Sequence, residues 1–378
     1  MEKLRSMKKR ISAVLAVIMA AAMFTGCAAS GGTTAAETPK AAEVSESTAA
    51  GSTEAPADAS KDGITDKDSS TGKDSTGAGE PAQRIVSGYY ITTSACIALG
   101  LQDRMVGIEA KAASRPVYQM AAPEFLELPS VGTAKEFDLE GCAALEPDLV
   151  ILPKKLSEQA DILEGMNIRT LVVNPESMEA LKETIREIAA LTGTEGQAEK
   201  LLGWYAQKEE KLAGILEKAS LEKKTEDSVP SVYIAGTSSI LRAATPQMYQ
   251  SSLIKLAGGV NAASDLKDNG WADISYEQLI AYNPDVIVVI PEADYTKEDV
   301  MKDSRLTGVN AVKNGQVYEM PSSFEAWDSP VPSGILGCMW LSSALHEELY
   351  PFDEFKEEAA EFYREFYGAE IDRSLITR

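Results

Sequence analysis

DLEGCAALEPDLVIL, residues 138–152, is matched far along the chain by SYEQLIAYNPDVIVVI, residues 275–290. In each stretch a polar residue stands two positions before a glutamate, Glu140 or Glu277. A segment rich in apolar residues follows, and after it come Pro-Asp and a segment with β-branched residues. The proline follows the glutamate by seven positions in both copies. A helix that leads into a buried strand, present twice with little else repeated, predicts two similar lobes.

Helix capping explains part of this pattern. Asp138 and Ser275 are good N-cap residues, and a glutamate in the first helical turn is favoured by the helix dipole. Gln278, three residues after Ser275, completes a capping-box pattern. Either glutamate alone is typical of a helix start, but the repetition indicates more. Two similar lobes would each present one carboxylate at an equivalent surface position.

Composition bounds the possible functions. The chain has 378 residues, 44% of them hydrophobic, which is sufficient for two domains with their own cores. Its formal charge of −22 argues against nucleic acid as a partner, because phosphate binding needs clustered Lys and Arg. The one histidine, His346, is expected on a helix surface, so a several-histidine metal site cannot be built. No GxSxG, HExxH, GxGxxG or phosphate-loop motif occurs, and we expect neither catalysis nor a cofactor.

The first 26 residues resemble a bacterial lipoprotein signal peptide. The basic segment MEKLRSMKKR precedes an apolar run of 13 residues, which is too short to span a bilayer, and FTGC follows at residues 24–27. This looks like a lipobox in which Phe24 replaces the usual Leu. It implies cleavage before Cys27 and lipidation of that sulfur, which would anchor the protein to a membrane. Cleavage removes a net +4, so the mature chain would carry about −26, from −22 minus 4.

The remaining chain divides by composition and periodicity. Residues 27–83, the lipidated cysteine and a segment without any aromatic residue, are predicted to form a disordered tether. Alternating strand and helix patterns then predict an α/β lobe over residues 84–193 and a second over residues 226–378. Between the lobes, residues 194–225 lack proline and carry apolar residues at helical spacing. We therefore predict a single long helix that joins the lobes.

From Arg84 to Gly368 the chain resembles the substrate-binding proteins of ABC importers for iron-siderophores, cobalamin and haem, the class with a helical backbone. The likeness rests on RIVSG with ALGLQDRMVGI, ELPSVG, the two repeated stretches and MYQSSLIKLAGGVNAASDL, which appear in the family's order. It implies two Rossmann-like lobes with a ligand cleft between them, in a lipid-anchored monomer on the extracytoplasmic face of the bacterial cell membrane. It also implies that Glu140 and Glu277 each dock onto one subunit of a permease dimer, which works with ATPase subunits.

The resemblance places the ligand between the lobes, at the carboxyl ends of the strands. Aromatic and charged residues stand after predicted strands or where relatives contact their ligands. The predicted ligand-binding residues are Tyr89, Tyr90, Arg115, Tyr118, Arg242, Trp271, Glu325, Trp327 and Asp328. Trp271 matches an aromatic cleft position of cobalamin-binding relatives, but its counterpart in the first copy is Ala134. That departure weakens cobalamin and haem as ligands.

Charge guides the prediction of the ligand. Arg115 and Arg242 are cationic loop residues on a strongly acidic chain, and together with the aromatic residues they suit an anionic ferric catecholate or carboxylate siderophore. We therefore predict a ferric siderophore as the transported ligand. Molybdate or tungstate, which one branch of the family binds, and cobalamin or haem are alternatives within the same fold. A secreted enzyme or a structural surface lipoprotein is disfavoured, since neither needs one glutamate per lobe.

We expect a Cys27→Ala variant to lose its lipid and to move from the membrane to the soluble extracellular fraction. The acyl chains on this sulfur would supply the anchoring, and the substitution removes all of them. Cell fractionation followed by immunoblotting measures the change. A variant that remains in the membrane fraction would place the anchor elsewhere in the chain.

Overall fold

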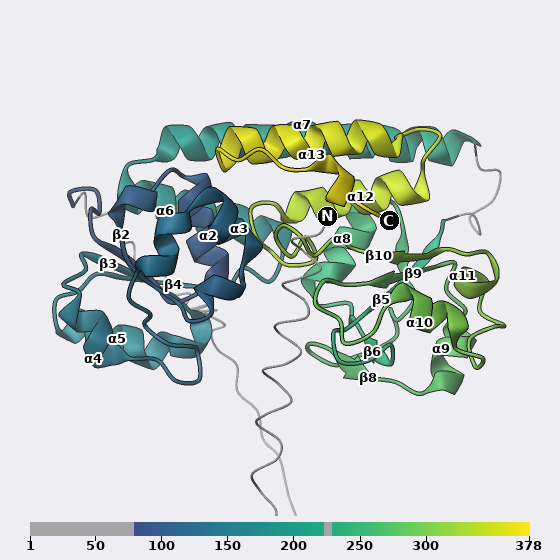
Figure 1. Ribbon diagram of the computed structural model, residues 1–378, viewed down its shortest axis with the longest axis horizontal. Helices are drawn as coiled ribbons and strands as arrows, with labels where there is room; N and C mark the ends of the chain where they lie inside the picture. Colours follow the sequence, from purple (N-terminus) through teal and green to yellow (C-terminus); the bar gives the residue numbers. More distant parts are fainter. Residues whose placement is uncertain (1–78, 223–228) are drawn as a thin grey trace, which may run out of the picture. The chain divides into compact units, whose positions relative to one another are not determined.

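Two α/β lobes lie side by side, and a long helix, α7 (Glu195–Glu222), runs across both of them (Figure 1). This computed structural model describes residues 79–222 and 229–378, which belong to one compact unit, Ser75–Arg378. The predicted leader, Cys27 and most of the predicted tether lie outside the described residues. A parallel sheet in one lobe and a mainly parallel sheet in the other, joined by one long helix, confirm the predicted fold class.

The N-terminal lobe is built on a parallel four-stranded sheet in the order β2–β1–β3–β4. The central strands β1 and β3 are buried along their whole length, which explains their near-continuous apolar sequence. The strands are β1 (Ile85–Ser87), β2 (Met105–Ile108), β3 (Leu149–Pro153) and β4 (Thr170–Val173). The α-helices are α2 (Tyr90–Ala98), α3 (Pro116–Ala121), α4 (Leu139–Ala144), α5 (Ser157–Gly165) and α6 (Met178–Thr192). Short 3-10 helices are η1 (Gln102–Arg104), η2 (Ala112–Ser114), η3 (Pro123–Glu127) and η4 (Lys154–Leu156).

The C-terminal lobe repeats this plan with additions. Its sheet has the order β10–β9–β5–β6–β8, in which β10, β9 and β5 are parallel, β7 pairs parallel with β5, and β6 and β8 are antiparallel additions. The strands are β5 (Ser231–Ala235), β6 (Arg242–Ala243), β7 (Val260–Asn261), β8 (Ala272–Asp273), β9 (Val286–Val289) and β10 (Val317–Glu319). The helices are α8 (Tyr249–Ala257), α9 (Tyr276–Tyr282), α10 (Lys297–Lys302), α11 (Asn310–Lys313), α12 (Gly334–Leu345), α13 (Phe352–Phe366) and η6 (Arg373–Leu375).

Both copies of the repeated stretch form a short helix that leads into a central strand, α4 into β3 and α9 into β9. The predicted N-caps are confirmed: the side chains of Asp138 and Ser275 accept hydrogen bonds from the backbone N–H groups three residues on. The predicted capping box at Ser275 forms only in part. Gln278 donates its side-chain amide to the Tyr282 hydroxyl, 2.8 Å away, because that partner lies one turn further along the same helix face.

The aspartate of each Pro-Asp pair fastens the two central strands of its lobe together. Asp148 accepts backbone hydrogen bonds from Gln83 (2.8 Å) and Arg84 (3.0 Å), just before β1. Asp285 accepts from the backbone N–H (3.0 Å) and the hydroxyl (2.9 Å) of Ser231, the first residue of β5. The repeated aspartate therefore has the same structural task in both lobes.

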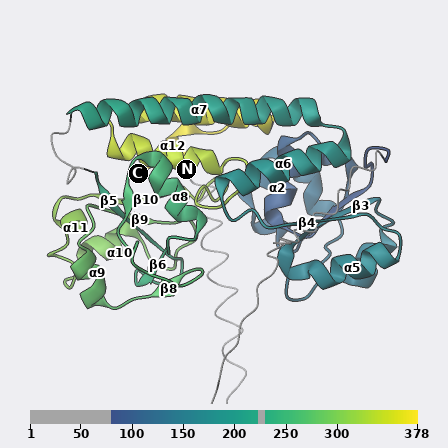
Figure 2. The same ribbon diagram turned by 180° about the vertical axis from the view of Figure 1, so that it is seen from behind.

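Helix α7 packs on helices of both lobes. It contacts α6 of the N-terminal lobe and α8 and α12 of the C-terminal lobe, as the view from behind shows (Figure 2). Its 28 residues reach about 40 Å at 1.5 Å per residue. The prediction extended the helix over residues 194–225, and residues 223–225 lie outside the described part of the chain.

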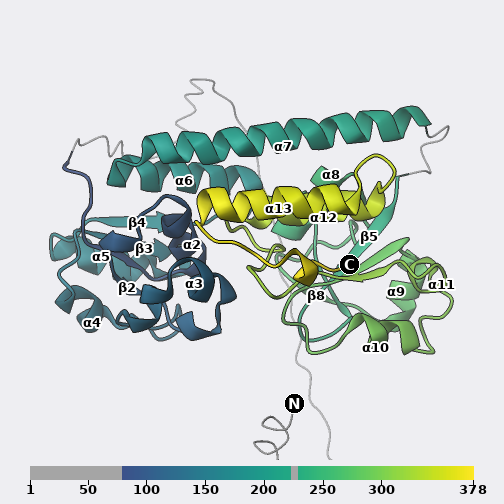
Figure 3. The same ribbon diagram turned by 45° about the horizontal axis from the view of Figure 1, so that its top comes forward.

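The C-terminal helix α13 lies alongside α7 in antiparallel direction, which the sequence pattern did not predict (Figure 3). Trp204 of α7 packs on Phe362 with 5.0 Å between ring centroids. Lys208 and Lys211 bind the Glu358 carboxylate at 2.6 and 2.8 Å. The layer above the lobes therefore consists of two helices rather than one.

One apolar core continues from the N-terminal lobe through α7 into the C-terminal lobe. It includes Ile185 of α6, Leu201 and Ile215 of α7, and Leu253 of α8. A smaller core lies on the other face of each sheet. His346 ends α12 and is buried, contrary to expectation, because the chain turns there beneath α7. No helix among residues 79–222 and 229–378 is long and apolar enough to cross a membrane.

The contact between α8 and α7 predicts a strong effect of one methyl group. Gly258 ends α8 with a left-handed backbone, φ +92°, and a Cβ there would lie 2.0 Å from Leu216 Cδ2 of α7. We expect Gly258→Ala to lower the free energy of unfolding by about 2–5 kcal/mol, from backbone strain and overpacking together. Urea denaturation of the purified chain measures it.

Gly315→Ala is the matched control. Gly315 also has a left-handed backbone, φ +68°, but no atom lies within 4 Å of the position that a Cβ would take there. We expect only the backbone cost in this variant, about 1–2 kcal/mol. Equal losses in the two variants would show that the α8–α7 contact yields easily.

Candidate functional site

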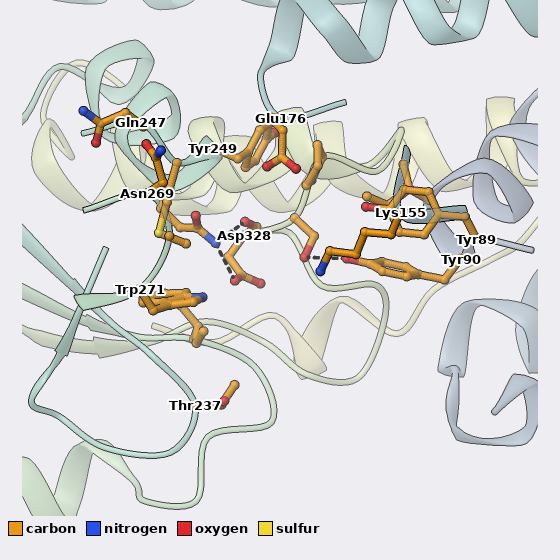
Figure 4. Close-up of a pocket in the computed structure, with 17 residues that line it drawn as sticks. Tyr89, Tyr90, Lys155, Glu176, Thr237, Gln247, Tyr249, Asn269, Trp271 and Asp328 are labelled. Carbon is orange, nitrogen blue, oxygen red and sulfur yellow. Dashed lines mark hydrogen bonds between the residues drawn. The ribbon is translucent and has the colours of Figure 1, made fainter. Parts of the chain in front are cut away.

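A pocket of about 640 Å³ opens between the two lobes (Figure 4). This volume lies within the range of small-molecule sites, about 300–1,000 Å³. Both lobes line it, and we call it the inter-lobe pocket. Its position is the one that the family resemblance implies.

The N-terminal lobe contributes residues that directly follow its parallel strands. Tyr89 and Tyr90 come after β1 and begin α2, Lys155 lies in η4 after β3, and Glu176 follows β4. Since the carboxyl ends of parallel strands meet at one edge of a sheet, these side chains gather at one side of the pocket. Lys155 and Glu176 are exposed at its rim.

The C-terminal lobe contributes loops and one helix. Thr237 follows β5, Trp271 precedes β8, Gln250 belongs to α8, and Asp328 and Ser329 lie in the loop before α12. Figure 4 shows the Asp328 carboxylate between Trp271 on one side and Tyr90 with Lys155 on the other. The pocket thus has aromatic side walls and polar groups between them.

A hydrogen bond joins the lobes at the pocket. The Tyr90 hydroxyl donates to Ser329 Oγ at 3.4 Å. The Tyr89 and Tyr90 rings meet edge to face, 5.3 Å between centroids. Burial raises the pKa of both phenols above their ordinary value. Both hydroxyls therefore stay protonated and can donate hydrogen bonds to a ligand.

Asp328 is a buried carboxylate that faces the pocket, with only 6% of the residue exposed. Gln250 donates its side-chain amide to the Asp328 backbone oxygen (3.0 Å) and to Oδ2 (3.2 Å). Burial raises the pKa of Asp328 to about 6. Among the described residues, no cationic side chain forms an ion pair with it.

Arg115 borders a second, smaller cavity of about 30 Å³ that shares Tyr90 with the inter-lobe pocket. Its guanidinium lies 4.2 Å from the Tyr90 ring centroid, and its Nε lies 3.4 Å from Glu109 Oε1. Glu109 is buried and also accepts hydrogen bonds from Thr93 (2.5 Å) and Tyr118 (2.7 Å). Burial raises the pKa of Glu109.

Glu325 lines the same small cavity from the C-terminal lobe. It is buried, and its Oε2 accepts hydrogen bonds from the hydroxyls of Ser333 and Tyr367, the latter at 2.7 Å. Burial raises the pKa of Glu325. The hydroxyls hold this carboxyl group against the C-terminal lobe.

The structure brings some of the predicted ligand-binding residues together and separates others. Tyr89, Tyr90, Trp271 and Asp328 line the inter-lobe pocket, and Arg115 and Glu325 line the small cavity. The remaining three line neither cavity.

Tyr118 and Trp327 are fully buried. Tyr118 supports Glu109, while Trp327 stacks on Phe324, 5.8 Å between centroids, and donates its indole N–H to Tyr363 at 2.9 Å. They pack the core here instead of facing a ligand.

Arg242 lies on β6, where its guanidinium approaches Asp273 on the neighbouring β8 at 3.4 Å. Its guanidinium also donates to the backbone oxygen of Trp271 at 3.5 Å, and Arg242 itself is not among the residues that line the pocket.

Sequence reasoning missed Lys155, Glu176 and Gln250. Lys155 and Glu176 carried a usable signal, because they directly follow the apolar segments of β3 and β4, whose carboxyl ends were expected at the cleft. Gln250 carried none, since it lies within an ordinary helical pattern.

Glu140 and Glu277 are both exposed, in the first turns of α4 and α9. These helices lie on the side of the lobes that faces away from α7 (Figure 1). A hydrogen bond from its own backbone N–H, and after it one from the Ser275 hydroxyl, lowers the pKa of Glu277, so its carboxylate is charged at neutral pH. Each lobe thus presents one surface carboxylate at the equivalent place.

Two lobes on a helical layer, with a pocket between them, are the arrangement of a protein that binds a small ligand between its lobes. The family model described as periplasmic binding protein matches residues 85–324. The chain belongs to this family. It is a substrate-binding protein of an ABC importer, from the branch of the family that includes the iron-chelate and vitamin B12 binders.

Three relatives show the range of the family. The molybdate-binding protein MolA of Haemophilus influenzae is 24% identical over 273 residues, 66% of this chain and 75% of MolA. The ABC transporter substrate-binding lipoprotein YvrC of Bacillus subtilis is 27% identical over 290 residues, 73% of this chain and 82% of YvrC. The heme uptake protein IsdE of Staphylococcus aureus is 24% identical over 211 residues, 54% of this chain and 70% of IsdE.

The solved structure of MolA with bound molybdate has the same fold. It superposes with a TM-score of 0.68 at 21% sequence identity, covering 78% of this chain and 95% of MolA.

The buried charge of Asp328 predicts a pH-dependent gain in stability on its removal. The pKa is raised from 3.8 to about 6 in the folded chain, so folding disfavours the charged form, and above pH 6 this costs about 3 kcal/mol at 1.36 kcal/mol per pKa unit. We expect Asp328→Asn, which cannot ionise, to raise the free energy of unfolding at pH 7.5 by about 2–3 kcal/mol. The gain should shrink as the pH falls from 6 to 4.

Urea denaturation at several pH values measures this difference. Asp273→Asn is the control, because the Asp273 side chain is 79% exposed and its charge costs little in the folded chain. A gain that does not change with pH would contradict the assignment of a disfavoured charge to Asp328.

Proposed function

We propose that the chain is the lipid-anchored, extracytoplasmic substrate-binding component of an ABC importer and that it delivers a metal chelate, first of all a ferric siderophore, to a membrane permease. The observation that carries this proposal is the inter-lobe pocket. Its volume of about 640 Å³ and its aromatic and hydrogen-bonding lining suit an organic chelate. We propose lipid attachment at Cys27 and a monomeric state from the resemblance seen in the sequence.

The donor groups argue against capture of a bare metal ion. Among residues 79–222 and 229–378 no group of three or more His, Cys, Asp or Glu side chains is placed to hold one. A metal that enters as cargo would therefore keep its own organic ligands, and the protein would recognise those.

The two arginines from which we expected a preference for an anionic chelate do not support that preference in the structure. Arg115 and Arg242, on which it rested, each lie beside a carboxylate, Glu109 and Asp273, and neither lines the inter-lobe pocket. Lys155 is the cation that lines the pocket, together with the acidic Glu176 and Asp328. This balance of charge suits a neutral or cationic chelate better than an anionic one.

The similarity to MolA supports a second candidate, a molybdate or tungstate carrier. A tetrahedral oxyanion would leave most of a 640 Å³ pocket unfilled and would meet two carboxylates for one lysine. We therefore place it after the chelate. The similarity to IsdE makes haem a third candidate, although the wall opposite Trp271 is formed by tyrosines rather than by a second tryptophan.

A ligand screen tests the proposed function. The purified chain is titrated with ferric hydroxamate, ferric catecholate and ferric citrate chelates, molybdate, tungstate, haemin and cobalamin. Tryptophan fluorescence and native mass spectrometry report binding. We expect a ferric chelate to bind most tightly. Tight binding of an oxyanion, haemin or cobalamin, with no chelate bound, would overturn the choice of ligand.

For docking, we propose that Glu140 and Glu277 each engage one permease subunit. Their position in equivalent first turns, one per lobe, supports this assignment. Exposed ion pairs contribute only about 0.2–1 kcal/mol each, so the two carboxylates would set orientation and association rate more than affinity.

We expect the double variant Glu140→Ala, Glu277→Ala to abolish ligand uptake by cells while leaving the affinity of the purified chain for the screened chelate unchanged. The two carboxylates lie outside the residues that line the pocket. Uptake of a radiolabelled chelate, alongside a binding titration, measures both effects.

The matched control is Glu158→Ala, Glu298→Ala. These exposed glutamates also occupy first helical turns, α5 in one lobe and α10 in the other. We expect normal uptake in this control. Equal loss of uptake in both double variants would contradict a specific docking role.

A further inference from the structure

Asp328 differs in its surroundings from the other buried acidic residues that the structure describes. These are Glu109, which lies beside Arg115, and Glu325, which is bound by the hydroxyls of Ser333 and Tyr367. Asp328 faces the open pocket, and the side-chain amide of Gln250 is its neutral partner there.

A buried carboxylate without a cation is costly, and proteins normally pair such groups. The charge could be relieved by a nearby basic side chain, but Lys155, which lines the same pocket, lies at the exposed rim and forms no ion pair with Asp328 in the described part of the chain. Glu292 adds a like charge to its surroundings. No positively charged group therefore stands beside Asp328 in the described part of the chain, and a ligand could supply one.

We propose that Asp328 binds a protonated amine of the transported chelate and that the adjacent Trp271 face supports the same cation. This inference rests on the proposed function, since it names a chemical group of the chelate. The ligand class would be a ferric chelate with a neutral metal core and a free ammonium group, such as a linear trihydroxamate that ends in a primary amine.

The geometry of the pocket fits such a ligand. Figure 4 shows Trp271 and Tyr90 on opposite sides of the Asp328 carboxylate, so an ammonium there would lie between two aromatic side chains. Lys155 at the rim and the tyrosine hydroxyls are hydrogen-bond donors, which suit the carbonyl and hydroxamate oxygens of the chelate core. The ammonium would go deep into the pocket and the core would lie nearer the rim.

A matched pair of chelates isolates the ammonium group. One is a linear ferric trihydroxamate that ends in a primary ammonium, and the other is the same chelate with that amine acetylated. Both are titrated against the full mature lipoprotein in detergent, and against its Asp328→Asn and Asp273→Asn variants. Ferric tricatecholate and molybdate serve as anionic probes, and haemin completes the set.

We expect the ammonium form to bind the unmodified chain about thirtyfold or more tightly than the acetylated form, since removal of one partner of a buried charge pair is expensive. In Asp328→Asn the two forms should bind about equally. Asp273→Asn should retain the full preference. Trp271→Leu should reduce the preference in part, because it removes the aromatic face and leaves the carboxylate.

The outcomes separate the inference from the proposed function. Equal binding of the two trihydroxamates by the unmodified chain, or a preference that survives in Asp328→Asn, overturns the inference and leaves a chelate carrier in place. Tight binding of ferric tricatecholate with no binding of either trihydroxamate also overturns the inference alone. Binding of molybdate or haemin, and of no chelate, overturns both.

Discussion

The packing of α7 across both lobes is the constraint on which the rest of the structure depends. Its apolar face belongs to the same core as α6 in one lobe and α8 in the other, and α13 closes the layer from the side. A helix bends sharply only where its hydrogen-bond ladder is broken, and no proline occurs in α7. We therefore expect the two walls of the pocket to stay at a nearly fixed distance when a ligand binds, so that side chains and loops would make most of the adjustment.

The repeated stretch combines residues with clear structural partners and one glutamate for which we propose a docking role. Its cap residue, its apolar run and its Pro-Asp aspartate all have structural partners: Asp148 and Asp285 fasten neighbouring strands, and Asp138 and Ser275 begin the helices. The glutamate in the same stretch is exposed in both lobes, and the hydrogen bonds of Glu277 stay within its own first helical turn. This difference is the physical argument for an external partner, because fold alone accounts for the other repeated polar residues.

Much of the fold could be predicted from the sequence, since apolar runs and helical periodicity report burial directly; α7 and the central strands are examples. The residues of the candidate site were harder to predict from the sequence. Trp327 and Asp328 are neighbours, yet the first packs in the core and the second faces the pocket, and only the path of the loop decides which. Arg115 was expected to bind an anion because its partner Glu109 could not be known to be buried beside it.

The carboxylates of this acidic chain divide into classes with different physical roles. Glu358 and Glu109 lie beside cations of the chain itself, whereas Glu140 and Glu277 are solvated and cost little to keep charged. Asp328 is neither paired with a cation nor solvated, so its charge opposes folding. A ligand that supplies the missing cation would recover part of that energy on binding. If Asp328 binds an ammonium group, the cost of its charge in the empty pocket becomes selectivity for a ligand that carries one.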